Sequence, residues 1–214
     1  MRQILVYGDS LSWGIIPLTR RRLTFQERWP GVMEDRLNGA GGPVRVIEDC
    51  LNGRRTVWED PFKPGRNGLQ GLQQCIESHS PLSLVILLLG VNDFQSMHPH
   101  NAWHSAQGIS VLVTAIREAP IEPGMPVPPI LVVAPPPART PKGPLAPKFQ
   151  GVDVKCRGLA EAYREATELL DCRFFDAGTV ITSSALDGVH LDADQHLKLG
   201  ETLAEVCRPL LAGA

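Results

Sequence analysis

Three side chains in this sequence have the types needed for nucleophilic catalysis. Ser10 follows a short apolar run, and Asp187 and His190 stand three residues apart near the other end of the chain. A serine hydroxyl becomes a strong nucleophile only when a base takes its proton, and a histidine held by a carboxylate is a suitable base. We expect Ser10 to act as the nucleophile, His190 as the base, and Asp187 as the group that orients and stabilises the imidazole.

Acyl transfer by a serine also needs donors for the negative oxygen that forms on attack. The backbone amides of Ser10 and Gly53 and the side chain of Asn92 are donors of this kind. Gly53 has no side chain, so a substrate can approach its backbone closely. We therefore expect Ser10, Gly53 and Asn92 to form an oxyanion hole.

Each of these residues also has a purely structural interpretation. Asp9 and Ser10 are favoured caps of a following helix, and Asp187-Gly188 is a common turn dipeptide. His190 could form only a local hydrogen bond, and Asn92 could begin the next helix or turn. Taken singly, these alternatives are at least as good as the catalytic interpretation, so the choice depends on whether the fold brings the residues together.

Strand and helix patterns alternate five times along the chain. Short apolar runs predict strands at residues 3–7, 44–48, 84–89, 130–134 and 173–177. Helical spacing of apolar residues predicts helices at residues 25–37, 69–79, 155–170 and 193–211, and another around 109–116. This alternation predicts a doubly wound α/β fold: a three-layer α/β/α sandwich with a five-stranded, mainly parallel, flavodoxin-like sheet, in a single domain over residues 1–214.

A parallel sheet of this kind collects residues that are far apart in the sequence. Right-handed crossovers bring the carboxyl ends of the strands to one edge, where such folds bind ligands. Ser10, Gly53 and Asn92 each follow one of the first three strands, and Asp187 and His190 follow the fifth. Purely structural roles for all five at one edge would be a coincidence, which favours the catalytic interpretation.

The same residues carry a resemblance to the GDSL, or SGNH, hydrolase family. Gly8-Asp9-Ser10-Leu11 is similar to the first sequence block of that family, Gly53 to its second, Gly90-Val91-Asn92-Asp93 to its third and Asp187-Gly188-Val189-His190 to its last. The blocks occur in the family's order and span nearly the whole chain. The resemblance implies a serine hydrolase with Ser10 as nucleophile, His190 and Asp187 as its base and partner, and the oxyanion hole named above.

A narrower resemblance is to the bacterial arylesterase/acyltransferase branch of the family. It rests on residues 8–14, 46–54 and 131–137, and the chain departs from that branch at residues 52, 53 and 55 and over 94–129. The branch implies esters of short acyl groups, acetyl to butyryl, with aryl or small alcohols, acyl transfer to alcohols, and a homo-oligomer. Within this resemblance we expect five neighbours of the catalytic residues to bind the substrate: Asp9, Leu11, Trp13, Asn52 and Val189. Trp13 is expected to form a wall of the acyl pocket.

Composition and charge limit the partners. A net charge of −2 favours neither a nucleic acid nor an anionic membrane, and no run approaches the roughly 20 apolar residues that span a bilayer. Five scattered cysteines without Cys-x-x-Cys spacing are typical of reduced thiols in the cytoplasm. We expect no cofactor and no metal, because His100 and His104 lack the glutamate of a zinc helix. The basic run Arg20-Arg21-Arg22 is interpreted as a solvated loop.

Other functions remain open. The same catalytic parts suit a carbohydrate O-acetyl esterase, and the Gly8–Ser10 turn could belong to a flavodoxin-like module that binds an anion or another small molecule. The binding module lacks a G-x-G-x-x-G sequence and leaves Asp187 and His190 without a role. The proline-rich segments 120–129 and 135–151 are long for ordinary loops, and we expect a lid or an assembly element there.

Overall fold

Five short apolar segments form one parallel sheet in the computed structural model, which describes residues 1–39 and 42–212. The strands are β1 (Arg2–Gly8), β2 (Val44–Cys50), β3 (Leu84–Leu88), β4 (Ile130–Ala134) and β5 (Arg173–Asp176), in the spatial order β2-β1-β3-β4-β5. Every residue of β3 and β4 is buried, as expected for strands that are covered on both faces. The strands lie where the apolar runs predicted them.

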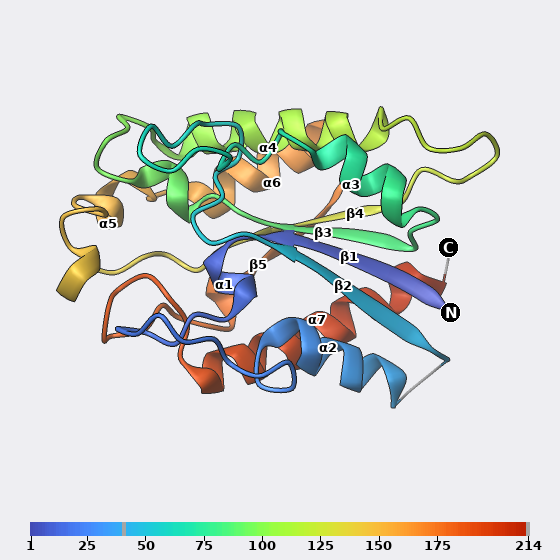
Figure 1. The fold of residues 1–214 in the computed structure, drawn as a ribbon, viewed down its shortest axis with the longest axis horizontal. Helices are drawn as coiled ribbons and strands as arrows, with labels where there is room; N and C mark the ends of the chain where they lie inside the picture. The colour runs from blue at the N-terminus through green and yellow to red at the C-terminus, as the bar shows by residue number, and fades with distance from the viewer. Residues whose placement is uncertain (40–41, 213–214) are drawn as a thin grey trace.

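Helices cover both faces of the sheet (Figure 1). α2 (Trp29–Asn38) and α7 (Ala193–Ala212) pack together on one face, and α3 (Leu72–His79), α4 (Ala102–Arg117) and α6 (Leu159–Leu169) lie on the other. The shorter elements are α1 (Ser10–Trp13), α5 (Val152–Lys155) and the 3₁₀ turns η1 (Val91–Phe94), η2 (Gly143–Leu145) and η3 (Ala177–Thr179). The predicted three-layer α/β/α sandwich is confirmed, and all four strand pairs are parallel.

Helix boundaries differ from the apolar spacing for local reasons. α2 begins at Trp29 rather than residue 25, with Pro30 in its first turn, where a missing N–H costs nothing. The helix expected over residues 155–170 is divided into α5 and α6, and Gly158 in the left-handed conformation separates them. Within the two described ranges, no helix is long and apolar enough to cross a membrane.

The register of β1 aligns the carboxyl ends of three neighbouring strands. Gly8, the last residue of β1, pairs with Cys50 at the end of β2 and with Leu88 at the end of β3. The chain therefore leaves the three strands at one level. The segments that follow, α1, the turn at residues 51–53 and η1, lie at the same edge of the sheet, at the left of Figure 1.

The two proline-rich segments lie at opposite edges. Residues 120–129 form a projecting loop between α4 and β4, at the right of Figure 1. Residues 135–151 follow β4 at its carboxyl end, contain η2, and therefore belong to the edge that carries α1.

Candidate active site

Ser10, Asp187 and His190 come together at the carboxyl edge of the sheet. Ser10 begins α1 directly after β1, and the other two residues lie in the connection between η3 and α7. Nε2 of His190 lies 3.2 Å from Oγ of Ser10, and Nδ1 lies 2.8 Å from Oδ2 of Asp187. A proton on Nδ1 is donated to the carboxylate and leaves the lone pair of Nε2 facing the serine hydroxyl, which is the geometry of a nucleophile beside an oriented base.

The carboxylate of Asp187 is held by its own turn. Its Oδ1 accepts hydrogen bonds from the backbone N–H groups of Val189 and His190, both at 2.9 Å. Gly188 has a φ of 82°, and a Cβ at this position would lie 2.6 Å from the carbonyl oxygen of Thr140. Only glycine fits such a position without strain. The turn interpretation of Asp187-Gly188 and the catalytic one are thus compatible, because the turn places the carboxylate against the imidazole.

Asp187 stays ionised at neutral pH. Burial alone would raise its pKa, but the hydrogen bond and charge of His190, together with the two backbone N–H donors, outweigh burial and lower the pKa to about 2. A carboxylate in this state can stabilise the imidazolium that forms when His190 takes a proton.

The three expected oxyanion-hole residues lie at the same edge. Ser10 is the first residue of α1, so its N–H has no partner within the helix. Gly53 lies in the turn after β2, and Asn92 lies in η1 after β3. Nδ2 of Asn92 donates to Oδ2 of Asp9 at 2.8 Å and to the carbonyl of Arg54 at 3.1 Å. A substrate oxygen would therefore share or replace the longer of these two bonds.

Asp9 has a different role from the substrate contact that we expected. The residue is fully buried. Its Oδ1 accepts from the N–H of Leu11 at 2.8 Å and caps α1, while its Oδ2 accepts from Asn92. Burial raises its pKa to about 7, against the effect of the Leu11 and Asn92 donors. The helix-cap interpretation was therefore right for Asp9, whose carboxyl group also fixes the position of Asn92.

The other expected substrate contacts also change. The side chains of Leu11 and Val189 are each 1% exposed and belong to the hydrophobic core, which corrects the expectation that they meet a substrate. Asn52 is half-buried, and its carbonyl accepts from Nε of Arg66 at 3.0 Å. Trp13 is half-buried, and the guanidinium of Arg22 lies 4.6 Å from the centroid of its ring.

A series of buried polar side chains behind Asn92 was missed from the sequence. Nε2 of Gln95 donates to Oδ1 of Asn92 at 2.8 Å, and Arg55 donates to Oε1 of Gln95. Arg55 is fully buried, and its Nη1 lies 3.1 Å from Oδ2 of Asp60. The series fixes the plane of the Asn92 amide. Only Arg55 had attracted notice, as a departure from the related branch, and no spacing rule connects residues 55, 60 and 95.

Asp93 anchors the same 3₁₀ turn from its other side. Its carboxylate accepts from the N–H and hydroxyl of Thr56 at 2.9 and 2.8 Å and from the hydroxyl of Ser105 at 2.6 Å. Ser105 is in turn 2.7 Å from the hydroxyl of Tyr163 on α6. Burial raises the pKa of Asp93 to about 6, and these donors act against that rise. η1 is thus tied to the β2–α3 connection and to two helices.

A hollow of about 250 Å³ opens beside His190. Its walls are Leu18, Thr19 and Arg20 from the connection after α1, and Pro144 and Leu145 from η2, together with Asp187 and His190. Trp13 is not among the lining residues, so apolar side chains from two loops take the place of the wall that we expected from it. The proline-rich segment 135–151 contributes to this site through η2.

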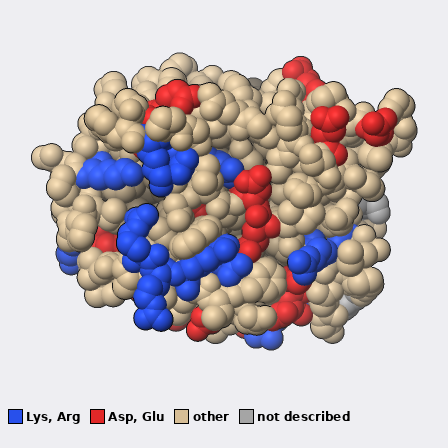
Figure 2. Space-filling view, viewed as in Figure 1, with Lys and Arg blue, Asp and Glu red and all other residues tan. Residues whose placement is uncertain are grey.

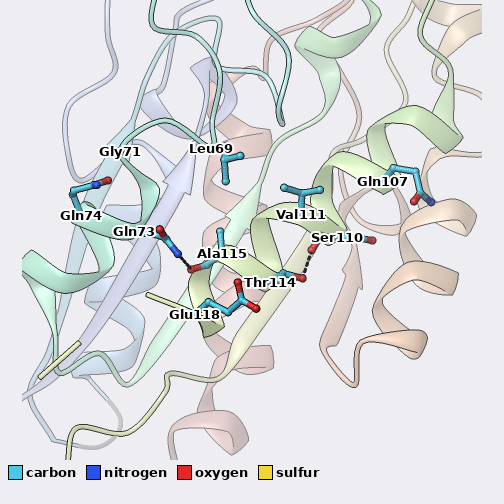
Figure 3. A pocket seen from close by; sticks show the side chains of 10 residues that line it. All are labelled: Leu69, Gly71, Gln73, Gln74, Gln107, Ser110, Val111, Thr114, Ala115 and Glu118. Carbon is cyan, nitrogen blue, oxygen red and sulfur yellow. Dashed lines mark hydrogen bonds between the residues drawn. The ribbon is translucent and has the colours of Figure 1, made fainter. Parts of the chain in front are cut away.

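A second hollow, of about 620 Å³, lies between α3 and α4 (Figure 3). Leu69 and Val111 face it, and Gln73 donates to the carbonyl of Ala115 across its floor. None of the candidate catalytic residues reaches it. Across residues 1–39 and 42–212, no group of three or more His, Cys, Asp or Glu side chains is arranged to hold a metal ion. His100 and His104 instead stack with Trp58.

Comparisons with known proteins agree with this geometry. The model of the GDSL-like lipase/acylhydrolase family matches residues 6–202. The inhibitor-bound aryl esterase of M. smegmatis is 35% identical, with 98% of this chain and 100% of the esterase covered and a TM-score of 0.93; its native form is 36% identical, with the same coverage and a TM-score of 0.92. A carbohydrate acetylesterase from Sinorhizobium meliloti is 34% identical, with 98% and 100% covered and a TM-score of 0.92. A search of curated protein sequences gives no significant match.

The raised pKa of Asp9 predicts a pH-dependent loss of stability. Its folded pKa of about 7 exceeds the ordinary value of 3.8, so the folded state binds this proton more tightly than the unfolded state. The resulting stabilisation is complete below the ordinary pKa and is lost as the pH rises through the folded one. We expect the wild type to lose stability relative to Asp9→Asn between about pH 4 and about pH 8. Urea unfolding of both proteins over this range measures the difference, and a difference that stays constant contradicts the assignment.

Proposed function

The chain belongs to the GDSL-like lipase/acylhydrolase family and is a carboxylic ester hydrolase, and we propose that it cleaves short-acyl esters of aryl or small alcohols through an acyl-enzyme on Ser10. The observation that carries the proposal is the continuous hydrogen-bonded series from Ser10 through His190 to Asp187. The flavodoxin-like binding module is set aside, because it gives this series no task.

The mechanism follows from the positions of the protons. Ser10 Oγ attacks the carbonyl carbon of the ester while His190 Nε2 takes the hydroxyl proton, and the ionised Asp187 stabilises the imidazolium. His190 then gives the proton to the leaving alcohol, and the acyl group remains on Ser10. Water attacks the acyl-enzyme by the same route, with His190 as base, and releases the acid.

Three donors are proposed to stabilise the negative oxygen that forms in each step. The amides of Ser10 and Gly53 and the Nδ2 of Asn92 lie at the ends of β1, β2 and β3, which the strand register keeps at one level. The hydrogen bonds from Asn92 to Asp9 and from Gln95 to Asn92 support this role, because they orient the amide before a substrate arrives. Donors fixed in advance need no reorganisation during the reaction.

Short acyl groups are proposed because Ser10 lies deep. The residue is 6% exposed, Leu11 beside it is buried, and the ring of Trp13 is covered by Arg22. Little room is left for a long chain, and each added CH₂ contributes at most about 0.8 kcal/mol of burial. The aryl esterase among the similar structures supports an aryl alcohol, and the apolar Leu18 and Leu145 suit its ring.

The similar carbohydrate acetylesterase supports a second candidate, an O-acetylated sugar as substrate. Both candidates share the acyl-enzyme and differ only in the alcohol. Transfer to an added alcohol is also proposed, because an apolar hollow beside His190 can hold an alcohol next to the acyl-enzyme and limit water there. A cytoplasmic location is proposed on the five free cysteines, which suit a reducing compartment.

Ser10→Ala is expected to lower the turnover of 4-nitrophenyl acetate by at least about a thousandfold, as removal of an activated nucleophile does. Ser12→Ala is the matched control: it removes the same hydroxyl from the same helix, and that hydroxyl has no hydrogen-bond partner in the structure. The control should keep its activity and should be labelled by an organophosphonate, whereas the Ser10 variant should not. Near-normal turnover by Ser10→Ala would exclude the acyl-enzyme on this residue.

Acyl length can be tested with acetyl, butyryl and octanoyl esters of one phenol. We expect kcat/KM to be higher for the acetyl and butyryl esters than for the octanoyl ester, because the gain from burying extra CH₂ groups is smaller than the steric cost beside Ser10. An equal or higher value for the octanoyl ester contradicts the proposal. The same assays with an O-acetylated sugar and with an added primary alcohol rank the second candidate and measure acyl transfer.

We also propose that the chain forms a homo-oligomer. The support is the loop at residues 120–129, which projects from the molecule (Figure 1) and exposes 51% of Val127. An apolar side chain on a long projecting loop gains burial when a second copy covers it. Light scattering at micromolar concentration should give a multiple of 23.4 kDa. A mass equal to that of one chain contradicts the proposal.

A further inference from the structure

Positive side chains gather around the hollow beside His190. Figure 2 shows Lys and Arg side chains around a depression on the side where the carboxyl ends of the strands lie, with a strip of acidic side chains farther to the right. Four of the cations come from three connections: Arg20 after α1, Lys63 and Arg66 after β2, and Lys148 after η2. We call these four residues the cationic rim. Arg20 lines the hollow itself, so the exposed basic loop expected at residues 20–22 also forms part of the site.

The charges of the cationic rim are not neutralised by the protein. Within the described part of the chain, none of its charged nitrogens lies within 4.0 Å of a carboxylate. The nearby acids are already engaged, since Asp60 pairs with Arg55 and Asp187 with His190. A cation without a protein partner at the mouth of a site attracts an anion from solution.

The members of the cationic rim are close enough to influence one another. Partial burial lowers the pKa of Lys63, and the charges of Arg66 and Arg20 lower it further. Burial also lowers the pKa of Lys148, where the charges of Arg55, Lys63 and Arg20 act against that of Asp60. An anion bound among these residues relieves this repulsion.

Arg66 is fixed next to the proposed oxyanion hole. Its Nε donates to the carbonyl of Asn52 at 3.0 Å and its Nη1 to the carbonyl of Pro64 at 3.1 Å. Its Cδ lies 3.9 Å from the position that a Cβ on Gly53 would take. The guanidinium is therefore preorganised, and its charge acts on the site without a loss of side-chain freedom on binding.

The position of His190 indicates which part of the ester meets the cationic rim. His190 must hand its proton to the oxygen of the leaving alcohol, so the alcohol part has to lie on the side of His190. The hollow on that side contains Arg20. A neighbouring hollow of about 590 Å³ continues along the same loop and is lined by Lys63, Lys148, and the apolar Phe62 and Met97.

We propose that the preferred substrates are esters whose alcohol part carries a carboxylate, which the cationic rim binds at the mouth of the hollow. This rests on the proposed function and names its substrate class. The apolar side chains of Leu18 and Leu145 pack against the body of the alcohol, and Arg20 with Lys148 faces the carboxylate. A guanidinium suits this task, because its donors match the two oxygens of a carboxylate.

The test compares two acetyl esters that differ in charge, 4-acetoxybenzoate and the neutral 4-acetoxybenzamide. Each kcat/KM is divided by the rate of alkaline hydrolysis of the same ester, which corrects for the leaving group. At low salt the corrected ratio should favour the carboxylate by about threefold or more, since a complementary field raises association rates. The preference should shrink at an ionic strength of about 0.5 M, where charges are screened within a few Å.

Variants locate the effect. Arg20→Gln and Lys148→Gln should each lower the corrected ratio by about twofold or more, as loss of one surface charge pair does. Arg173→Gln is the matched control, because it removes the same charge from the exposed first residue of β5, at the opposite edge of the sheet. Its ratio should equal that of the wild type.

Two results overturn the inference. One is a wild-type ratio of one or less, and the other is a ratio that Arg20→Gln and Lys148→Gln leave unchanged. The proposed function fails separately: it falls if the wild type does not hydrolyse 4-nitrophenyl acetate, or if that activity survives Ser10→Ala. Hydrolysis of 4-acetoxybenzamide without preference for the carboxylate leaves the proposed function standing and removes only the charged substrate.

Discussion

The pairing of Gly8 with the last residues of β2 and β3 is the constraint on which the site depends. In a parallel sheet a shift of one residue moves each side chain to the opposite face. Such a shift in β1 would separate Ser10 from the turn after β2 and from η1. The uninterrupted apolar sequences of β1 and β3 hold the register, because a slip would bring their polar flanking residues into the core. The chemistry is thus fixed by packing some distance from any reacting atom.

Buried polar contacts convert this alignment of strands into an alignment of side chains. Asp9 links α1 to Asn92, and Gln95 links Asn92 to Arg55. Loss of one partner from such a series leaves another buried polar group unsatisfied, at a cost of about 1–3 kcal/mol. The series therefore tolerates few substitutions, and each group in it has one orientation. A site assembled from four separate connections can in this way be as rigid as one that is built on a single helix.

The sequence was sufficient for the strands and for the edge where Ser10, Asn92 and His190 meet, because both depend on patterns that are local or that follow from the topology. It was insufficient for contacts between segments that share no period. Arg55 and Gln95 belong to different connections, and nothing in their spacing indicates that they touch. Trp13 adjoins Ser10 in the sequence, which suggested a pocket wall. The chain turns back so that Ile15 pairs with Arg22, and Arg22 then covers the ring.

The hollow beside His190 has walls from the loop at residues 18–20 and from η2, whereas the reacting groups sit at strand ends or in turns tied to them. The two loops belong to no strand of the sheet, and changes in surface loops cost little folding free energy compared with changes in a core. Reactivity and substrate choice are consequently inherited through different parts of the chain. In a lineage with this architecture, new specificities can arise by drift in two connections while the chemical machinery stays under purifying selection. The same division makes these loops the natural units to exchange between relatives when an enzyme is redesigned.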